Sequence, residues 1–342
     1  MAEGYDWPAL LGRLMAHDDL SRGDAYDAMS EVMSGRATPA QIAAFIVSTT
    51  AKGETVAEMT GFVDAMYDAA VTVEIEGLVV DLVGTGGDRA GTFNISTTAA
   101  FVAAGAGVRI AKHGNRAASS QTGSADLLAA FGIPLDMSPA ETVRMVEDIG
   151  FGFFFAPHYH PAMRHAGPVR RELGVRTVFN YLGPLCHPAN VKHTTIGVSN
   201  GAMADKMIRV LANRGTEAAF VYYGEDGLDE MTLTGPSFIY RLRDGEITTA
   251  EFTPEDFGVP RAAIEALAGG DAATNVEITR AVLGGKRGAH RDVVMINAAP
   301  AIVVAGLADG FVEAMELAAA SIDSGAAEAT LQRAIEFAPA PE

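Results

Sequence analysis

Short apolar runs alternate with helix-like segments from residue 78 onward, and this alternation is the strongest constraint on the fold. The runs span residues 78–83, 108–111, 151–155, 194–198 and 218–223. Most of them are followed by an alanine-rich or amphipathic segment of helical periodicity, such as 97–106, 124–131 or 204–213. Parallel strands need a crossover connection, which is usually a helix. The sequence therefore predicts an α/β fold with a mainly parallel central sheet.

The N-terminal part has a different pattern. Apolar residues from 7 to about 70 recur at spacings of three and four, which predicts helices. Ser21 followed by Asp24 indicates a capping box at one helix start. The segment from His160 to about Pro188 interrupts the later alternation with a helix over 162–173 and a Gly-Pro turn. We expect a small all-helical domain of residues 1–72, completed by about 160–188.

The larger α/β domain is expected to comprise residues 73–159 and 189–342. Within it, residues 238–248 predict a hairpin with its turn at Asp244-Gly245. Residues 274–335 are predicted to be mostly helical.

Composition limits the partners. The 43 acidic residues outnumber the 25 Lys and Arg, and the net charge of -18 disfavours nucleic-acid binding. The apolar stretches are shorter than the ~20 residues of a membrane helix, and residues 1–6 do not resemble a signal peptide. The single cysteine, Cys186, excludes an intramolecular disulfide and suits a reducing compartment. We therefore expect a cytoplasmic protein without nucleic-acid or membrane partners.

A glycine-rich turn follows the first predicted strand. Gly84-Thr85-Gly86-Gly87-Asp88 places three glycines in five residues, which lets backbone N–H groups approach an anion closely. Asn94-Ile95-Ser96-Thr97 then begins a helix, where unpaired N–H groups and hydroxyls favour a phosphate. The spacing fits neither common nucleotide-binding fingerprint. Taken alone, these residues are equally consistent with a tight turn and an ordinary Asn cap.

A second polar turn strengthens the phosphate interpretation. It follows the next strand as Lys112-His113-Gly114-Asn115-Arg116, and Gly123-Ser124 then opens a helix. Residues 84–124 hold four basic side chains and one acidic side chain, in an otherwise acidic protein: Arg89, Arg109, Lys112, Arg116 and Asp88. Open α/β sheets bind ligands in the crevice at the carboxyl ends of their strands. We therefore predict a phosphate site formed by the two turns.

Three further groups carry chemical information. Four arginines in one short stretch suit carboxylate or phosphate recognition, although an exposed helix face is the alternative: Arg164, Arg170, Arg171 and Arg176. His158 and His160 lack a third ligand nearby and are expected to shape a loop. Asp229-Glu230 follows another predicted strand and could hold Mg²⁺ through oxygen, or could simply be solvated.

Together these segments resemble the anthranilate phosphoribosyltransferases, over nearly the whole chain. The resemblance rests on Gly84–Asp88, Asn94–Thr97, Lys112–Arg116, Arg170 with 172–177, and 224–230. It implies a Mg²⁺-dependent pentosyl-transferring glycosyltransferase that joins anthranilate to 5-phosphoribosyl 1-diphosphate, releasing diphosphate, in L-tryptophan biosynthesis. It also implies the two-domain fold shared with nucleoside phosphorylases, and a homodimer.

The resemblance also implies a set of site residues. The catalytic group would be Lys112, Arg170, Asp229 and Glu230. Mg²⁺ would be held by Ser96, Asp229 and Glu230. Anthranilate would meet Gly84, His113, Asn115, Arg170 and Pro184. The ribosyl diphosphate would touch Gly84, Gly87, Asp88, Thr92, Asn94, Ile95, Ser96, Thr97, Lys112, His113, Gly114, Asn115, Arg116, Ala117, Ala118, Ser119, Ser120 and Ser124.

Some positions depart from the family pattern, namely Gln121, His187, His193, Thr194 and Tyr223. None of them is an implied ligand, so they bear on affinity more than on the reaction. Two other functions remain as alternatives. A nucleoside phosphorylase of the same fold would need different residues after Lys112. A non-catalytic nucleic-acid-binding relative is opposed by the net charge of -18 and by the intact acidic pair.

Overall fold

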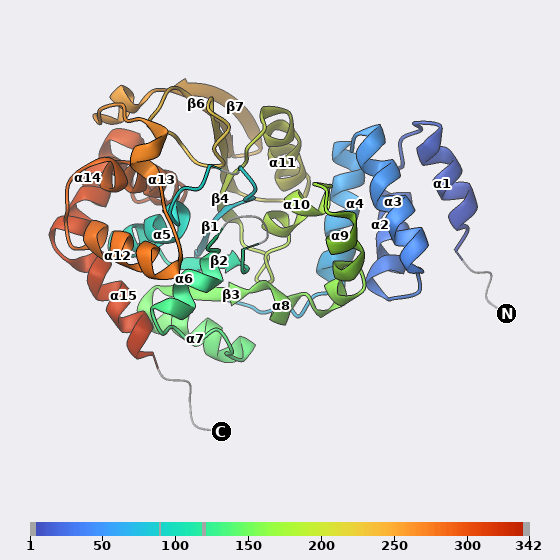
Figure 1. Ribbon diagram of the computed structural model, residues 1–342, viewed down its shortest axis with the longest axis horizontal. Coiled ribbons are helices and arrows are strands. Elements are labelled where there is room, and N and C mark those ends of the chain that lie inside the picture. Colours follow the sequence, from blue (N-terminus) through green and yellow to red (C-terminus); the bar gives the residue numbers. More distant parts are fainter. Residues whose placement is uncertain (1–4, 89, 118–120, 338–342) are drawn as a thin grey trace.

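The computed structural model describes residues 5–88, 90–117 and 121–337. A bundle of N-terminal helices forms one end of the molecule, and a larger α/β part forms the other (Figure 1). The bundle contains α1 (Trp7–Met15), α2 (Arg22–Met33), α3 (Pro39–Lys52) and α4 (Val56–Asp68). The predicted capping box is confirmed, because Ser21 and Asp24 bond reciprocally at the start of α2. The predicted combination of a helical N-terminal part and an α/β part is confirmed.

One mostly parallel sheet lies at the centre of the α/β part. Within the described residues it has the order β3-β2-β1-β4-β5-β6-β7. Its strands are β1 (Val80–Gly84), β2 (Ile110–Gly114), β3 (Phe151–Phe155), β4 (His193–Gly197), β5 (Ala218–Gly224), β6 (Ser237–Arg243) and β7 (Glu246–Phe252). The first five run parallel, and β6 and β7 are antiparallel. The predicted hairpin turn is confirmed, since Asp244 and Gly245 both have positive φ.

The two largest hydrophobic clusters of the described residues lie on opposite faces of the sheet, because successive strand residues point to opposite sides. On one face, Leu82 and Phe220 pack with the cluster that contains α5 (Ile95–Gly105) and α13 (Ala289–Val304). On the other face, Val83 and Val221 pack with α11 (Gly201–Asn213) and with the N-terminal helices. The remaining helices of the α/β part are α6 (Ser124–Ala130), α7 (Pro139–Ile149), α12 (Ala272–Leu283), α14 (Phe311–Asp323) and α15 (Ala326–Glu336), with short turns η3 (Pro254–Phe257) and η4 (Ile264–Leu267).

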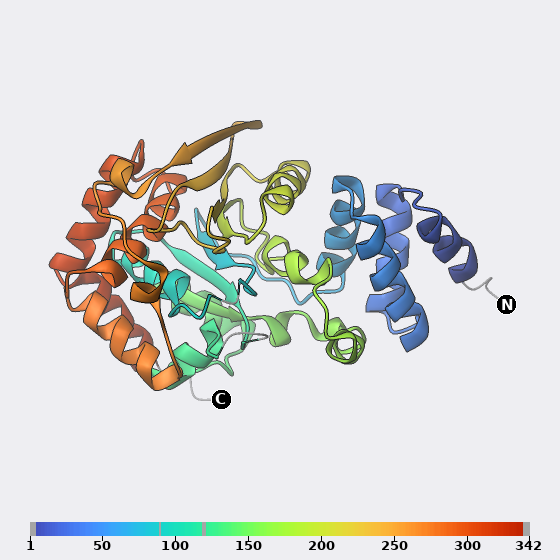
Figure 2. The same ribbon diagram turned by 45° about the horizontal axis from the view of Figure 1, so that its top comes forward.

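The segment after β3 runs from the sheet to the N-terminal helices. It contains α8 (Ala156–Tyr159), η1 (Pro161–Arg164), α9 (Gly167–Leu173), α10 (Phe179–Leu182) and η2 (Gly183–Leu185). α9 contacts α3, and α10 contacts α4. In both views this green segment lies between the sheet and the blue helices (Figure 1 and Figure 2).

Two sequence predictions differ from the structure. The single helix expected at 162–173 is broken, because Gly167-Pro168 starts a new helix at a residue without an N–H group. The strand expected at 108–111 begins later, at Ile110, because Val108 still bonds back to Ala103 at the end of α5. No helix among the described residues is long and apolar enough to cross a membrane.

Candidate active site

The candidate site lies where neighbouring parallel strands end. β1 lies between β2 and β4, so the glycine-rich turn after β1 is next to the polar turn after β2. The helix α5 after β1 packs on one face of the sheet, and α11 after β4 packs on the other face. The carboxyl ends of β1 and β4 therefore form a topological switch point of the sheet. The loop after β5 reaches the carboxyl ends of β1 and β4, because Asp229 contacts both Gly84 and Gly197.

Glycine is required where the acidic loop approaches the strand ends. A Cβ atom on Gly84 would lie 2.7 Å from Oδ2 of Asp229. A Cβ atom on Gly197 would lie 1.7 Å from the Asp229 carbonyl oxygen. Gly86 and Gly87 have φ values of +70° and +81°, and the Gly86 N–H donates to Oδ2 of Asp229 at 2.5 Å. The glycine-rich turn and the acidic loop therefore form one unit.

The acidic pair is buried rather than solvated. Asp229 and Glu230 are each only 7% exposed. The Ser96 N–H donates to Oε1 of Glu230 at 3.2 Å, whereas Oε2 of Glu230 is buried without a hydrogen-bond partner in the described structure. An acidic loop of ordinary solvated side chains is therefore excluded.

Burial and mutual repulsion shape the charge of this pair. Burial raises the pKa of Asp229 to about 7, and the nearby Asp88 carboxylate adds to the effect. Burial first, and then the charge of Asp229, raise the pKa of Glu230 well above its usual value. Such a pair attracts a cation, because a positive charge between the carboxylates would stabilise both ionised forms.

Asn297 holds the acidic loop and was not found from the sequence. Its side chain accepts from the Met231 N–H and donates to the Met231 carbonyl oxygen, both at 2.9 Å. Asn297 is fully buried in the middle of α13. Asn297 stands out in the sequence as an amide within an apolar helical segment, but its partner, Met231, is distant in sequence.

Lys112 is the buried cation of the site. Its side chain is 1% exposed, and Nζ donates to the Leu82 carbonyl oxygen. Burial lowers its pKa, while Asp81, Glu230 and Asp229 oppose that effect. Asp81 is also buried; it accepts from the His113 N–H at 3.0 Å, and burial raises its pKa to about 7. Lys112 is therefore buried within electrostatic reach of the acidic pair and does not project into solvent.

The second turn is organised by its own hydrogen bonds. Asn115 Oδ1 accepts from the Arg116 N–H at 2.7 Å, and the Asn115 carbonyl oxygen accepts from Ser124 Oγ at 3.2 Å. Asp126 binds the Arg116 guanidinium at 2.8 Å and the Ala117 N–H at 3.0 Å. Ala118, Ser119 and Ser120 lie outside the described residues.

Asn94 does not cap the start of α5, where the Ser96 N–H donates instead to the distant Glu230 carboxylate. Asn94 precedes the helix but makes no cap hydrogen bond. It donates instead to the Thr122 carbonyl oxygen at 3.0 Å and accepts from Asn275 Nδ2 at 2.9 Å. The ordinary Asn cap considered in the sequence is therefore wrong. Thr92 forms an isolated bridge with Ala268, which fixes the segment leading into α5.

The expected cluster of positive charge is only partly present. Arg109 precedes β2, at the opposite end of the strand, and donates to the Glu76 carbonyl oxygen at 2.5 Å. Arg116 is neutralised by Asp126. Arg89 lies outside the described residues. The prediction treated side chains at both ends of β2 as neighbours, although a strand separates them.

Arg170 and Arg176 stack on aromatic rings of α10. Arg170 lies over Phe179 at 5.2 Å, and Arg176 over Tyr181 at 5.4 Å. Burial lowers the pKa of Arg170, and no carboxylate among the described residues pairs with it. Arg176 donates to the carbonyl oxygens of the glycine-rich turn.

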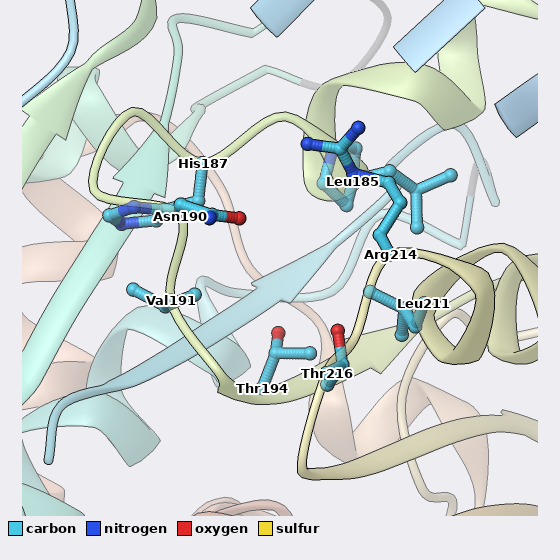
Figure 3. Close-up of a pocket in the computed structure, with 9 residues that line it drawn as sticks. Leu185, His187, Asn190, Val191, Thr194, Leu211, Arg214 and Thr216 are labelled. Atoms are coloured by element: carbon cyan, nitrogen blue, oxygen red, sulfur yellow. The ribbon is translucent and has the colours of Figure 1, made fainter. Parts of the chain in front are cut away.

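Three buried histidines lie near the path expected for anthranilate. The His113 ring is 5.2 Å from that of His160 and 5.6 Å from that of His187. Burial lowers the pKa of all three, to about 3 for His187. Pro184 and His187 line a cavity of about 20 Å³ with Asn190, Thr194 and Arg214 (Figure 3), room for one water molecule. That cavity adjoins the start of β4, away from the acidic pair.

The structure thus brings together three of the predicted segments. The glycine-rich turn, the start of α5 and the acidic pair are joined by the Gly86–Asp229 and Ser96–Glu230 hydrogen bonds. Arg170 and Pro184 belong to the segment after β3 and make no hydrogen bond to the acidic pair within the described residues. Those residues contain no group of three or more His, Cys, Asp or Glu that could hold a metal.

The fold and site define a class of transferase. Residues 76–328 match the glycosyl transferase family, a/b domain, and residues 8–70 match the helical bundle domain of the same family.

Individual relatives narrow this class. Anthranilate phosphoribosyltransferase from Moorella thermoacetica is 51% identical over 330 residues, which are 96% of this chain and 97% of the relative. The crystal structure of anthranilate phosphoribosyltransferase from Thermus thermophilus is similar with a TM-score of 0.90 and 39% identity, covering 96% and 98% of the two chains. The Saccharomyces cerevisiae enzyme in complex with PRPP and Mg has a TM-score of 0.88 and 27% identity, covering 96% and 97%. The chain belongs to the anthranilate phosphoribosyltransferase family.

Proposed function

We propose that this protein transfers the 5-phosphoribosyl group of 5-phosphoribosyl 1-diphosphate to the amine of anthranilate. The products are N-(5-phosphoribosyl)anthranilate and diphosphate, and the step belongs to L-tryptophan biosynthesis. One observation carries the proposal: a glycine-rich turn with partly exposed backbone is hydrogen-bonded to a buried acidic pair at the carboxyl ends of parallel strands. This arrangement suits a phosphate group and a cation together, and the family membership supports it.

The ribosyl diphosphate would lie along the two turns and the start of α5. The first-turn residues would be Gly84, Gly87 and Asp88, followed by Thr92 and Asn94–Thr97. The second turn would contribute Lys112–Arg116, Ala117–Ser120 and Ser124. The start of α5 supports this, because the helix dipole there favours an anion.

Mg²⁺ would be held by Ser96, Asp229 and Glu230. The donor set fits, since Mg²⁺ takes oxygen ligands and commonly uses one or two carboxylates together with substrate phosphates. The buried, unpaired Oε2 of Glu230 and the raised pKa values of the acidic pair support a cation here. When bound, Mg²⁺ would neutralise charge on the leaving diphosphate.

The chain's own residues would supply the rest of the chemistry. The amine of anthranilate is neutral near pH 7, so positioning is more important than a strong base. Arg170 would bind the anthranilate carboxylate, because it is a half-buried guanidinium without a carboxylate partner among the described residues. Lys112 would offset the charge of the acidic pair. The other anthranilate residues would be Gly84, His113, Asn115 and Pro184.

We also propose the domain division and the assembly. The helical domain would combine residues 1–72 with about 160–188, since α9 contacts α3 and α10 contacts α4. The α/β domain would comprise 73–159 and 189–342. The protein would act in the cytoplasm as a homodimer.

The direct test follows anthranilate fluorescence with ribosyl diphosphate and Mg²⁺ present. We expect consumption that requires both. A folded protein that leaves anthranilate unchanged would refute the proposed reaction. Glu230→Gln should raise the Mg²⁺ concentration needed for half-maximal turnover, and an unchanged Mg²⁺ requirement would remove Glu230 as a ligand.

A further inference from the structure

Arg176 makes three hydrogen bonds that the reaction described above does not use. Nη2 donates to the Gly86 carbonyl oxygen at 3.0 Å, and Nη1 donates to the Gly87 carbonyl oxygen at 3.1 Å. Nη1 also donates to Ser199 Oγ at 3.1 Å. The guanidinium stacks on Tyr181 at 5.4 Å, and a Cβ atom on Gly87 would lie 3.2 Å from its Cζ. The side chain is therefore fixed against the glycine-rich turn.

These bonds determine the direction of the peptide groups in the turn. In a trans peptide the C=O of one residue and the N–H of the next point in opposite directions. Arg176 attracts the carbonyl oxygens of Gly86 and Gly87, so the N–H groups of Gly87 and Asp88 point away from it. Neither N–H donates a hydrogen bond to another described residue. Two adjacent N–H donors are thus left available on the outer side of the turn.

The opposite side of the turn is fixed by the acidic loop. Gly86 donates its N–H to Asp229 and accepts from Arg176 through its carbonyl oxygen. No carboxylate among the described residues pairs with Arg176, and its Nε is buried without a partner. The positive charge beneath the turn is therefore not neutralised by another side chain.

We propose that Arg176 is a positioning residue for the phosphate-binding turn, which aims the Gly87 and Asp88 N–H groups at the diphosphate. The proposal rests on the proposed function for the identity of the substrate. Arg176 also lies in the turn between α9, which carries Arg170, and α10.

Arg176→Lys and Arg176→Ala test this assignment, with Arg171→Ala as the matched control. Arg171 is an exposed arginine in the same segment. We expect Arg176→Ala to raise the KM for ribosyl diphosphate by about tenfold or more, with kcat at saturation changed much less. Arg176→Lys should recover only part of the loss, because an amine cannot hold two carbonyl oxygens as a planar fork does. Arg171→Ala should leave both KM values unchanged.

A purely structural role predicts a different result. Lower kcat with an unchanged KM for ribosyl diphosphate would overturn the proposal, as would equal increases in both KM values. If circular dichroism shows that Arg176→Ala is unfolded, the KM values of Arg176→Lys decide between the two roles.

Calorimetric binding of inorganic diphosphate with Mg²⁺ separates this proposal from the proposed reaction. If the wild type binds diphosphate but does not consume anthranilate, the proposed reaction is wrong. The binding measurement still tests whether Arg176 positions the turn for diphosphate. We then expect about tenfold weaker diphosphate binding in the Arg176 variants. Equal affinity in wild type and variants would overturn the role of Arg176.

Discussion

Arg170 is a guanidinium held by an aromatic ring instead of a carboxylate. Stacking on Phe179 fixes its plane while its donors stay available. Its pKa is lowered by burial, so the charge is partly desolvated and gains more from a bound carboxylate than an exposed arginine would.

Arg170→Ala should raise the KM for anthranilate by about tenfold or more and change the KM for ribosyl diphosphate much less. Steady-state kinetics with each substrate varied in turn measures this. Arg171→Ala, on the same helix and exposed, is the control. Equal increases in both KM values would contradict the assignment.

His187 makes stability sensitive to acid. Its Nε2 bonds to the Ala111 carbonyl oxygen at 2.8 Å, and burial lowers its pKa from 6.5 to about 3. Between these values the unfolded chain binds a proton that the folded chain does not. The free energy of unfolding therefore falls as the pH decreases from about 6.5 to about 3.

Replacement of His187 by Asn removes this dependence of stability on proton binding. The wild type should lose up to about 1.4 kcal/mol per pH unit from this group, and His187→Asn should show a shallower slope. Urea unfolding at pH values of about 4.5, 5.5 and 7, which span this window, would measure the slopes. His17→Asn, at an exposed histidine, should keep the wild-type slope. Parallel slopes for wild type and His187→Asn would rule out this contribution.

At the scale of elements, α13 positions the acidic loop through one side chain. Asn297 satisfies both backbone groups of Met231, the residue after Glu230. A helix on one face of the sheet therefore determines where the acidic pair lies.

Asn297→Ala should lower the free energy of unfolding by about 1–3 kcal/mol, because two buried backbone groups lose their partner. It should also raise the Mg²⁺ concentration needed for half-maximal turnover. Chemical denaturation and a Mg²⁺ titration of activity measure the two effects. Lower stability with an unchanged Mg²⁺ requirement would limit Asn297 to a structural role.

At the scale of the whole molecule, an ion pair connects α4 with the residue after α11. Asp64 of α4 pairs with Arg214 and also with Arg22, the latter at 2.6 Å. Arg214 stacks on Tyr67 at 5.4 Å, and its side chain is 12% exposed. Loss of Asp64 would leave a largely buried guanidinium without its carboxylate partner.

Asp64→Asn should therefore destabilise the protein by about 1–3 kcal/mol. Asp205→Asn is the control, because it removes one partner of the exposed Asp205–Arg209 pair, and its effect should be at most about 0.5 kcal/mol. Urea unfolding compares the two variants. A similarly small decrease in the free energy of unfolding of both variants would show that the Asp64–Arg214 pair behaves as a surface pair.

Local patterns in the sequence predicted the elements, and distant contacts determined the site. The β1 turn and the Asp244-Gly245 hairpin follow from neighbouring residues. Burial of Asp229 could not be predicted, because it depends on Gly84 and Gly197 from two other strands. The missing Asn94 cap has the same origin, since Asn275 and Thr122 compete for the side chain.

The single cysteine, Cys186, can report on the opening of the contact between its segment and α4. Cys186 is 1% exposed, its Sγ lies 3.8 Å from the Val63 carbonyl oxygen of α4, and burial raises its pKa to about 12. A thiol reagent can therefore react only after the segment around Cys186 separates from α4. Because the chain has one cysteine, the labelling rate measures how often this contact opens, without any engineered probe.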